Sequence, residues 1–291
     1  MKSAKKSRTT IFLHVAKTAG TTLNQVLGRE YADILSFYIP KESESHFEDF
    51  KNRLKNENAA LIRGHFEFGW HYFLSRPFTY FTILRDPVER VISEYFYILR
   101  SPGHPLFSHV AKKNVSLVDF VKKWNAPNLQ TKKISGTTFA KNSGVSQDVE
   151  VNADNMLKMA KENLNKHFAV VGLTERFDET LILFKREFGW DWPFYIRDNV
   201  TKDKVAGEDI PSSTIDIIKE YNRLDIELYE YAKKCFTEQI DSQGQSFYDE
   251  VEKFKELNKI HVDKIIRNKN KPVKFLNLKR KIKRLVRYLW T

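Results

Sequence analysis

The chain has 291 residues, enough to bury a sizeable core, and its content of 41% hydrophobic residues, with 22 Phe and 12 Tyr, excludes an intrinsically disordered protein. Cys235 is the single cysteine, which excludes a disulfide within this sequence and favours a reducing compartment. Residues 253–291 hold 14 Lys and Arg against Glu256 and Asp263, so this segment alone accounts for the net charge of +12, and the neutral remainder gives no reason to expect nucleic-acid binding.

The stretch at residues 11–23, IFLHVAKTAGTTL, predicts a strand that runs through a loop into a helix. Its apolar start is typical of a strand buried on both faces. The small residues of the loop allow close backbone approach, and the free N–H groups at a helix start favour an anion. Further donors are the side chains of Lys17, Thr18, Thr21 and Thr22. The loop has the chemistry of a phosphate cradle, although a plain strand-to-helix turn would read the same way.

This loop differs from the common nucleotide-binding loop. That loop reads GxxxxGK[ST], with the lysine after the last glycine, whereas Lys17 here precedes Gly20.

The next predicted elements are a helix over 20–29, a short strand within 31–38, a helix over 47–56 and a strand over 59–63. His65 lies just past the end of the last of these strands, after Gly64, and is expected near the loop that holds Lys17, because parallel strands end at one edge of a sheet. Its pKa range suits a base, but a histidine that only packs would look the same.

A second motif follows the strand predicted over 78–84. Asp86 is a good N-cap, Pro87 suits the first helical position, and Glu89 falls where a capping box places its acid. The helix is expected to run to about Leu99. Arg85 therefore lies at the carboxyl end of the strand, on the edge predicted for the first loop.

The rest of the chain predicts helices over 117–124, 152–164 and 177–188, a strand over 168–173, and one amphipathic helix over 211–236. The stretch 128–136, NLQTKKISG, fits either a contact with a ligand or a surface turn.

The C-terminal segment predicts a helix over 247–266 and a basic amphipathic segment over 275–290. Apolar residues recur there at helical spacing, and Lys and Arg fill the other faces. This pattern is typical of a helix that lies in the plane of a membrane surface. A helix docked on the domain, an oligomer contact or a site for a polyanion would give the same pattern.

Together the two motifs resemble those of the sulfotransferases that use 3′-phosphoadenosine 5′-phosphosulfate (PAPS). AKTAGTT is similar to their 5′-phosphosulfate loop, and LRDPVERVISEYF to their 3′-phosphate motif, R-D-P-x-x-R-x-x-S-x-[YW]. The similarity, over residues 9–235, is to the carbohydrate enzymes that include the heparan sulfate 2-O- and 6-O-sulfotransferases. It implies an α/β fold of the P-loop-NTPase type, with three layers and a central, mainly parallel sheet. This sulfotransferase domain would occupy residues 1–246. A helical basic extension would occupy 247–291.

The resemblance implies in-line transfer of a sulfuryl group from PAPS to a carbohydrate hydroxyl, without a metal. His65 would be the base, with Lys17 stabilising charge on the leaving phosphate, and Glu67 is a second candidate base. The implied donor-binding residues are Lys17, Thr18, Ala19, Gly20, Thr21, Thr22, Arg85 and Ser93. The acceptor would be a polysaccharide, a glycolipid or a glycoside.

Two other classes stay open on the sequence: a P-loop kinase or NTPase, and a membrane- or polyanion-binding protein that acts through its basic tail. No stretch is long and apolar enough to predict a transmembrane helix. We therefore expect a cytoplasmic enzyme with a peripheral contact to the inner face of the membrane, unlike the membrane-anchored Golgi members of the family.

Overall fold

The computed structural model describes residues 8–39, 47–143, 152–196 and 210–269. The predicted membrane-contact segment 275–290 lies outside these ranges, so the membrane contact stays a prediction.

The centre of the fold is one five-stranded sheet in which every strand pair is parallel. In chain order the strands are β1 (Thr9–Leu13), β2 (Ser36–Ile39), β3 (Leu61–Gly64), β4 (Phe78–Leu84) and β5 (Phe168–Leu173), and their spatial order is β2-β3-β1-β4-β5. Since β3 and β4 flank β1 and run in the same direction, the segments that follow these three strands meet at one edge. That edge carries both motifs, as predicted.

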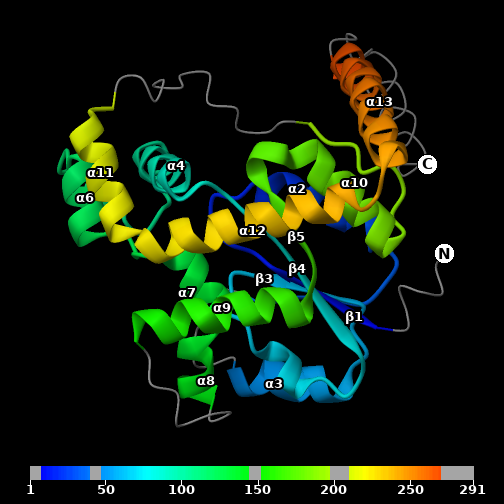
Figure 1. Cartoon of the computed structure of the whole chain (residues 1–291), viewed down its shortest axis with the longest axis horizontal. Coiled ribbons are helices and arrows are strands. Elements are labelled where there is room, and N and C mark those ends of the chain that lie inside the picture. The colour runs from blue at the N-terminus through cyan, green and yellow to red at the C-terminus, as the bar shows by residue number, and fades with distance from the viewer. Residues whose placement is uncertain (1–7, 40–46, 144–151, 197–209, 270–291) are drawn as a thin grey trace, which may run out of the picture.

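Helices cover both faces of the sheet, which confirms the predicted three-layer α/β fold. In Figure 1, α2 (Gly20–Glu30) and α10 (Phe177–Phe188) lie on one side, and α3 (Phe47–Asn56) and α9 (Ala153–His167) lie on the other. The bounds of α3, α10 and β4 are those that the sequence predicted. Each of these elements has a clear apolar period or a capping residue at its start.

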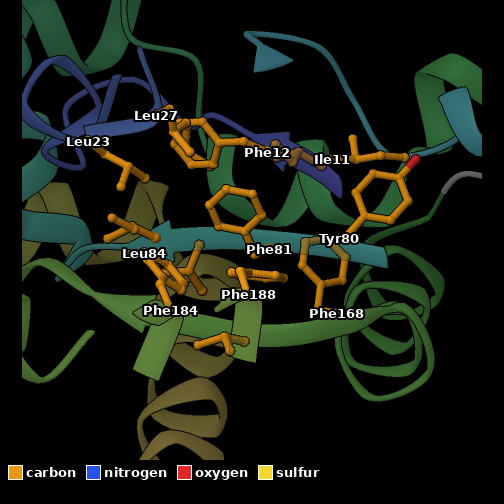
Figure 2. Close-up of a cluster of buried hydrophobic side chains, with 14 of the residues drawn as sticks. Ile11, Phe12, Leu23, Leu27, Tyr80, Phe81, Leu84, Phe168, Phe184 and Phe188 are labelled. Atoms are coloured by element: carbon orange, nitrogen blue, oxygen red, sulfur yellow. The ribbon is translucent and has the colours of Figure 1, made fainter. Parts of the chain in front are cut away.

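Aromatic side chains fill the space between the sheet and the helix α10, on the side of the sheet that α2 also covers (Figure 2). The rings of Phe12 and Phe81, from neighbouring strands, stack with centroids 5.0 Å apart, and Phe184 of α10 meets Phe81 edge-on at 4.9 Å. All three side chains are fully buried. This packing fixes β1 and β4, and therefore the ends from which the two motifs start.

Further helices complete the described part of the chain. They are α4 (Pro87–Leu99), α5 (Phe107–Val110), α6 (Leu117–Lys123), α7 (Leu129–Ser135), α8 (Thr137–Ser143), α11 (Ser212–Tyr221), α12 (Arg223–Asp241) and α13 (Gln245–Lys269), with short 3-10 helices η2 (Trp70–Phe73) and η3 (Thr174–Arg176). Their smaller apolar cluster joins α4, α6 and α11 through Val91, Phe120 and Ile218.

The predicted single helix over 211–236 is wrong, because the chain breaks at Asn222 into α11 and α12. Asn222 is fully buried, and its side-chain nitrogen donates to the Ile218 carbonyl oxygen at 2.9 Å. Its side-chain oxygen accepts from the main-chain nitrogen of Asn128 at 3.2 Å. An asparagine that bonds to main-chain groups competes with helix continuation.

The first half of α13 belongs to the main core. Phe247, Val251 and Phe254 are buried there, and Glu250 pairs with Lys185 and Arg186 of α10 at 2.8 and 2.7 Å. The predicted C-terminal extension is therefore anchored on the body at its start. No helix within the described ranges is long and apolar enough to cross a bilayer.

Candidate active site

The loop between β1 and α2 is shaped by two residues with left-handed backbone. Lys17 has φ of 70° and Ala19 has φ of 59°, values uncommon for residues with a Cβ. Ala19 caps α2 without a side-chain hydrogen bond, and the first turn of the helix holds no acidic residue. The N–H groups of this turn have no intrahelical partners, so the loop presents main-chain donors and the positive end of the helix dipole to an anion.

The three threonines of this loop differ in how far their hydroxyl groups are exposed to solvent. Thr18 is fully buried, and its hydroxyl donates to the Val15 carbonyl oxygen at 2.9 Å, so it holds the loop closed. Thr22 is buried in the first turn of α2, whereas Thr21 is exposed there. Thr21 is therefore the hydroxyl of the three that is open to solvent.

Arg85 joins the two motifs. It follows the last residue of β4, and its guanidinium donates to the main-chain oxygen of Lys17 at 3.3 Å. A second donation, to Glu89 Oε2 at 3.2 Å, is an i,i+4 ion pair. Two stretches that the sequence predicted to share an edge are thus in direct contact, 68 residues apart.

One face of α4 borders this contact. Glu89, Ser93 and Tyr97 are spaced four residues apart, which places them on the same face of the helix. Glu89 bonds to Arg85, and the ring of Tyr97 lies 3.8 Å from the Lys17 ammonium. Ser93 therefore lies on the face that borders the loop, between these two contacts.

Lys17 has an unusual electrostatic environment. Burial, and next the positive charge of Arg85, lower its pKa to about 8, while Glu94 opposes the shift. A partly desolvated ammonium beside another cation gains stability when an anion binds. The site therefore favours a negatively charged ligand.

His65 lies past the end of β3 and packs against His14, which follows β1. The two rings are 4.0 Å apart, and His65 Nδ1 lies 3.2 Å from the main-chain oxygen of His14. A carbonyl oxygen only accepts, so a hydrogen bond here requires the proton on Nδ1, and in that tautomer Nε2 is the basic nitrogen. Burial, and then the proximity of His65, lower the pKa of His14 to about 3, which keeps this neighbour uncharged. This contact fits the tautomer that a base needs, and the role of His65 as base stays a prediction.

Glu67, the second candidate base, serves the fold. Its carboxylate accepts from the main-chain nitrogen of Phe139 at 3.1 Å, in the first turn of α8. A carboxylate at a helix N-terminus is stabilised in its charged form by that position, and the role of Glu67 as a second base stays a prediction.

The helix α7 shows what the sequence left undecided between a ligand contact and a surface turn. This stretch forms a helix in which Gln130, Thr131, Ile134 and Ser135 are buried, so the surface turn is excluded and the ligand contact stays a prediction. Gln130 bonds to the main chain of Arg85, and Asp225 of α12 accepts from the main chain of Gln130. In the sequence, the one indication that Asp225 is a buried functional residue is its place among the apolar positions of an amphipathic helix.

Histidine, cysteine and carboxylate side chains of the described residues form no cluster of three that could hold a metal ion. The prediction of metal-free chemistry stays a prediction.

Comparisons with known proteins agree with these motifs. A family model described as galactose-3-O-sulfotransferase matches residues 1–274. Heparan-sulfate 6-O-sulfotransferase 1-B of Danio rerio is 26% identical over 273 residues, which cover 78% of this chain and 65% of that protein. Heparan-sulfate 6-O-sulfotransferase 2 of Gallus gallus is 26% identical over 288 residues, 82% of this chain and 70% of the relative. The matched region is thus about two thirds of each relative.

Among solved structures, mouse sulfotransferase SULT7A1 complexed with PAP matches at 16% identity and a TM-score of 0.30, covering 79% of this chain and 93% of the mouse chain. The family model is the stronger finding. Because it spans nearly the whole chain and both motifs, the protein belongs to the galactose-3-O-sulfotransferase family.

Proposed function

We propose that the protein transfers a sulfuryl group from PAPS to a hydroxyl of a carbohydrate. The contact between Arg85 and the Lys17 carbonyl carries this proposal, because it brings together the cations of the two motifs. PAPS has two anionic groups, at its 5′ and 3′ positions, so a site with two adjacent cationic parts suits it. Membership of a sulfotransferase family supports the same donor.

In this proposal the loop holds the 5′-phosphosulfate. The main-chain N–H groups of residues 18–22, including Ala19, Gly20 and Thr22, and the Lys17 ammonium would bind it. Arg85 and Ser93 would bind the 3′-phosphate, for which the forked donors of arginine are well suited. Thr18 contributes through its main chain, because its hydroxyl is used inside the loop.

Proton transfer falls to His65. Its Nε2 lone pair would accept the proton of the acceptor hydroxyl as the in-line transfer proceeds. Lys17 would stabilise the charge that grows on the leaving phosphate oxygen. PAPS supplies an already activated sulfuryl group, which carries less charge than a phosphoryl group, so we propose that no metal is needed.

For the acceptor we propose a carbohydrate. The family description and the names of the relatives each specify a hydroxyl of a sugar or a glycan. Cytoplasmic location and membrane contact through residues 275–290 are separate proposals, since they rest on sequence that the structure does not describe.

Calorimetric binding of PAP, the desulfated donor product, tests the donor. We expect PAP to bind without Mg²⁺ and far more tightly than ATP or ADP, and Arg85→Ala to lose most of that affinity. His65→Ala is the matched variant that separates binding from transfer, since it should bind PAP like the wild type and transfer no sulfuryl group.

ATP binding that needs Mg²⁺, with no preference for PAP, would overturn the proposal in favour of a kinase or NTPase. Full transfer activity in His65→Ala would remove His65 from the role of base while leaving the donor in place.

A further inference from the structure

Gln130 holds the main chain of Arg85 by two hydrogen bonds. The Arg85 N–H donates to Gln130 Oε1 at 3.0 Å, and the Gln130 amide nitrogen donates to the Arg85 carbonyl oxygen at 2.9 Å. β4 ends at Leu84, so Arg85 is the first residue beyond the sheet ladder. The side-chain amide supplies the pair of bonds that a neighbouring strand would make, and it fixes the direction in which the arginine side chain leaves the backbone.

A buried carboxylate fixes Gln130 in turn. Asp225 of α12 is fully buried, and it accepts from the main-chain nitrogens of Gln130 and Thr131 at 3.1 and 2.7 Å. It also accepts from the Thr131 hydroxyl at 2.7 Å. A carboxylate at the start of a helix satisfies N–H groups that have no intrahelical partner. Asp225 thus caps α7 from a distant part of the chain.

The capping is mutual. Asn128, the N-cap of α7, has a left-handed backbone and no side-chain bond to its own helix. Its side-chain oxygen instead accepts from the main-chain nitrogens of Leu224 and Asp225 at the start of α12, at 2.9 and 3.3 Å. The two helix starts therefore hold each other, and the position of Gln130 is set by both.

The other end of α7 reaches the base. The Lys133 ammonium donates to the main-chain oxygen of His65 at 2.8 Å. Gln130 and Lys133 are three residues apart and lie on one side of the helix. One short helix therefore holds the residue after β4 and the residue after β3, the two strands that flank β1.

We propose that α7 sets the spacing between the donor-binding arginine and the base, and that Gln130 is a positioning residue that determines selectivity for the 3′-phosphate of the donor. This inference rests on the proposed function. Without the two bonds from Gln130, the Arg85 main chain is free to turn and its guanidinium loses its fixed direction. The loss falls mainly on the 3′-phosphate, because the loop that would bind the 5′ group keeps its own bond from Thr18 to the Val15 carbonyl oxygen when the Arg85 contact with Lys17 weakens.

Two nucleotides that differ only in the 3′-phosphate test the role of Gln130. We measure the calorimetric affinity of PAP and of adenosine 5′-phosphate for the wild type and for Gln130→Met, which keeps the length of the side chain without its amide. The expected result is a loss of PAP affinity of roughly tenfold with unchanged affinity for adenosine 5′-phosphate. Equal weakening of both nucleotides, or full retention of the PAP preference, would overturn the inference.

Asn163→Ala is the control. The Asn163 amide donates to the carbonyl oxygens of Ile134 and Ser135, at the far end of α7. This variant loosens the same helix without touching Gln130, so the ratio of the two affinities should stay at the wild-type value. A ratio that falls as far as in Gln130→Met would assign the effect to the helix in general and overturn the specific role.

Lys133→Met tests the other end of α7 and keeps the proposal testable if Gln130→Met does not fold. We expect a lower kcat with unchanged PAP affinity, because the variant frees the main chain of His65 and leaves Arg85 in place. An unchanged kcat would overturn the role of α7 at the base. A wild type that binds both nucleotides equally would refute the proposed donor. If the wild type prefers PAP, the donor stands, and an unexpected result in a variant then counts only against the role of α7.

Discussion

At the scale of single residues, Lys17 is the group whose protonation controls the charge of the loop. Its pKa is lowered to about 8 by burial and by Arg85, well below the usual value for lysine. In the free protein the ammonium is therefore present at neutral pH and is lost as the pH rises through about 8. An anion that needs this charge must bind less tightly above that pH.

We predict that PAP affinity falls by up to about tenfold per pH unit above pH 8, because each unit then costs about 1.4 kcal/mol of protonation free energy. The phosphates of PAP are fully ionised in this range and add no slope. Calorimetry between pH 7 and pH 10 checks this. Lys17→Arg keeps a permanent charge and should give a flat profile, and a flat profile in the wild type would refute the role of the Lys17 charge.

How far the site could be predicted differs from residue to residue. Lys17, Arg85 and His65 each follow a strand at a position that strand patterns and a motif identify, and the structure brings the first two into contact. Gln130 gave no signal of this kind, and Asp225 gave only its place among apolar positions, because their partners lie 45 and 95 residues away in the chain. Local patterns carry no information about contacts at that separation.

Among the elements, α2 depends on its first residue. A Cβ at Gly20 would lie 1.7 Å from His14 Nε2, so the helix can start beside the histidine pair only with glycine. Gly28, near the end of the same helix, has no atom within 4 Å of an added Cβ. A side chain is therefore excluded by steric overlap at Gly20, whereas there is room for one at Gly28.

We predict that Gly20→Ala lowers the melting temperature and abolishes sulfuryl transfer, because the ring of His14 must move and His65 packs on it. Gly28→Ala should stabilise the protein by about 0.5–1 kcal/mol, since alanine has the higher helix propensity. Thermal unfolding and activity of both variants check this. Normal activity in Gly20→Ala would show that the histidine pair does not depend on this contact.

Element bounds were predicted well where the pattern is local. The bounds of α3, β4 and α10 match the sequence prediction, whereas β1 begins at Thr9, two residues before the predicted start of the strand at residue 11. The break at Asn222 was missed because the apolar period continues across it. Its cause is tertiary, a buried side chain that bonds to Asn128.

For the whole molecule, buried histidines control acid stability, and besides His14 at the site there is a second group away from it. His71 and His167 lie beside the first residues of β4 and β5, with their rings stacked 5.3 Å apart. Burial, and then His167, lower the pKa of His71 to about 4, and burial lowers that of His167. A histidine with a depressed pKa contributes stability above its unfolded value of about 6.5, and this contribution is lost as the pH falls toward the folded value.

We predict that the free energy of unfolding decreases between pH 6.5 and pH 4, with about 3 kcal/mol of the loss due to His71. Urea unfolding at pH 7.5, 6 and 5 measures the slope. His71→Leu cannot bind the proton and should show a shallower slope, even though its stability at neutral pH is lower. An unchanged slope would place the acid sensitivity elsewhere.

The mutual capping of α7 and α12 has a consequence for biosynthesis. Both motifs lie in the first third of the chain, yet the helix that fixes Arg85 receives its cap only when Asp225 has been made. A nascent chain that has emerged only as far as α10 holds the sheet and the loop, but its arginine still lacks a fixed direction. We therefore expect the donor site to mature only after α12 has left the ribosome, when most of the chain has been made.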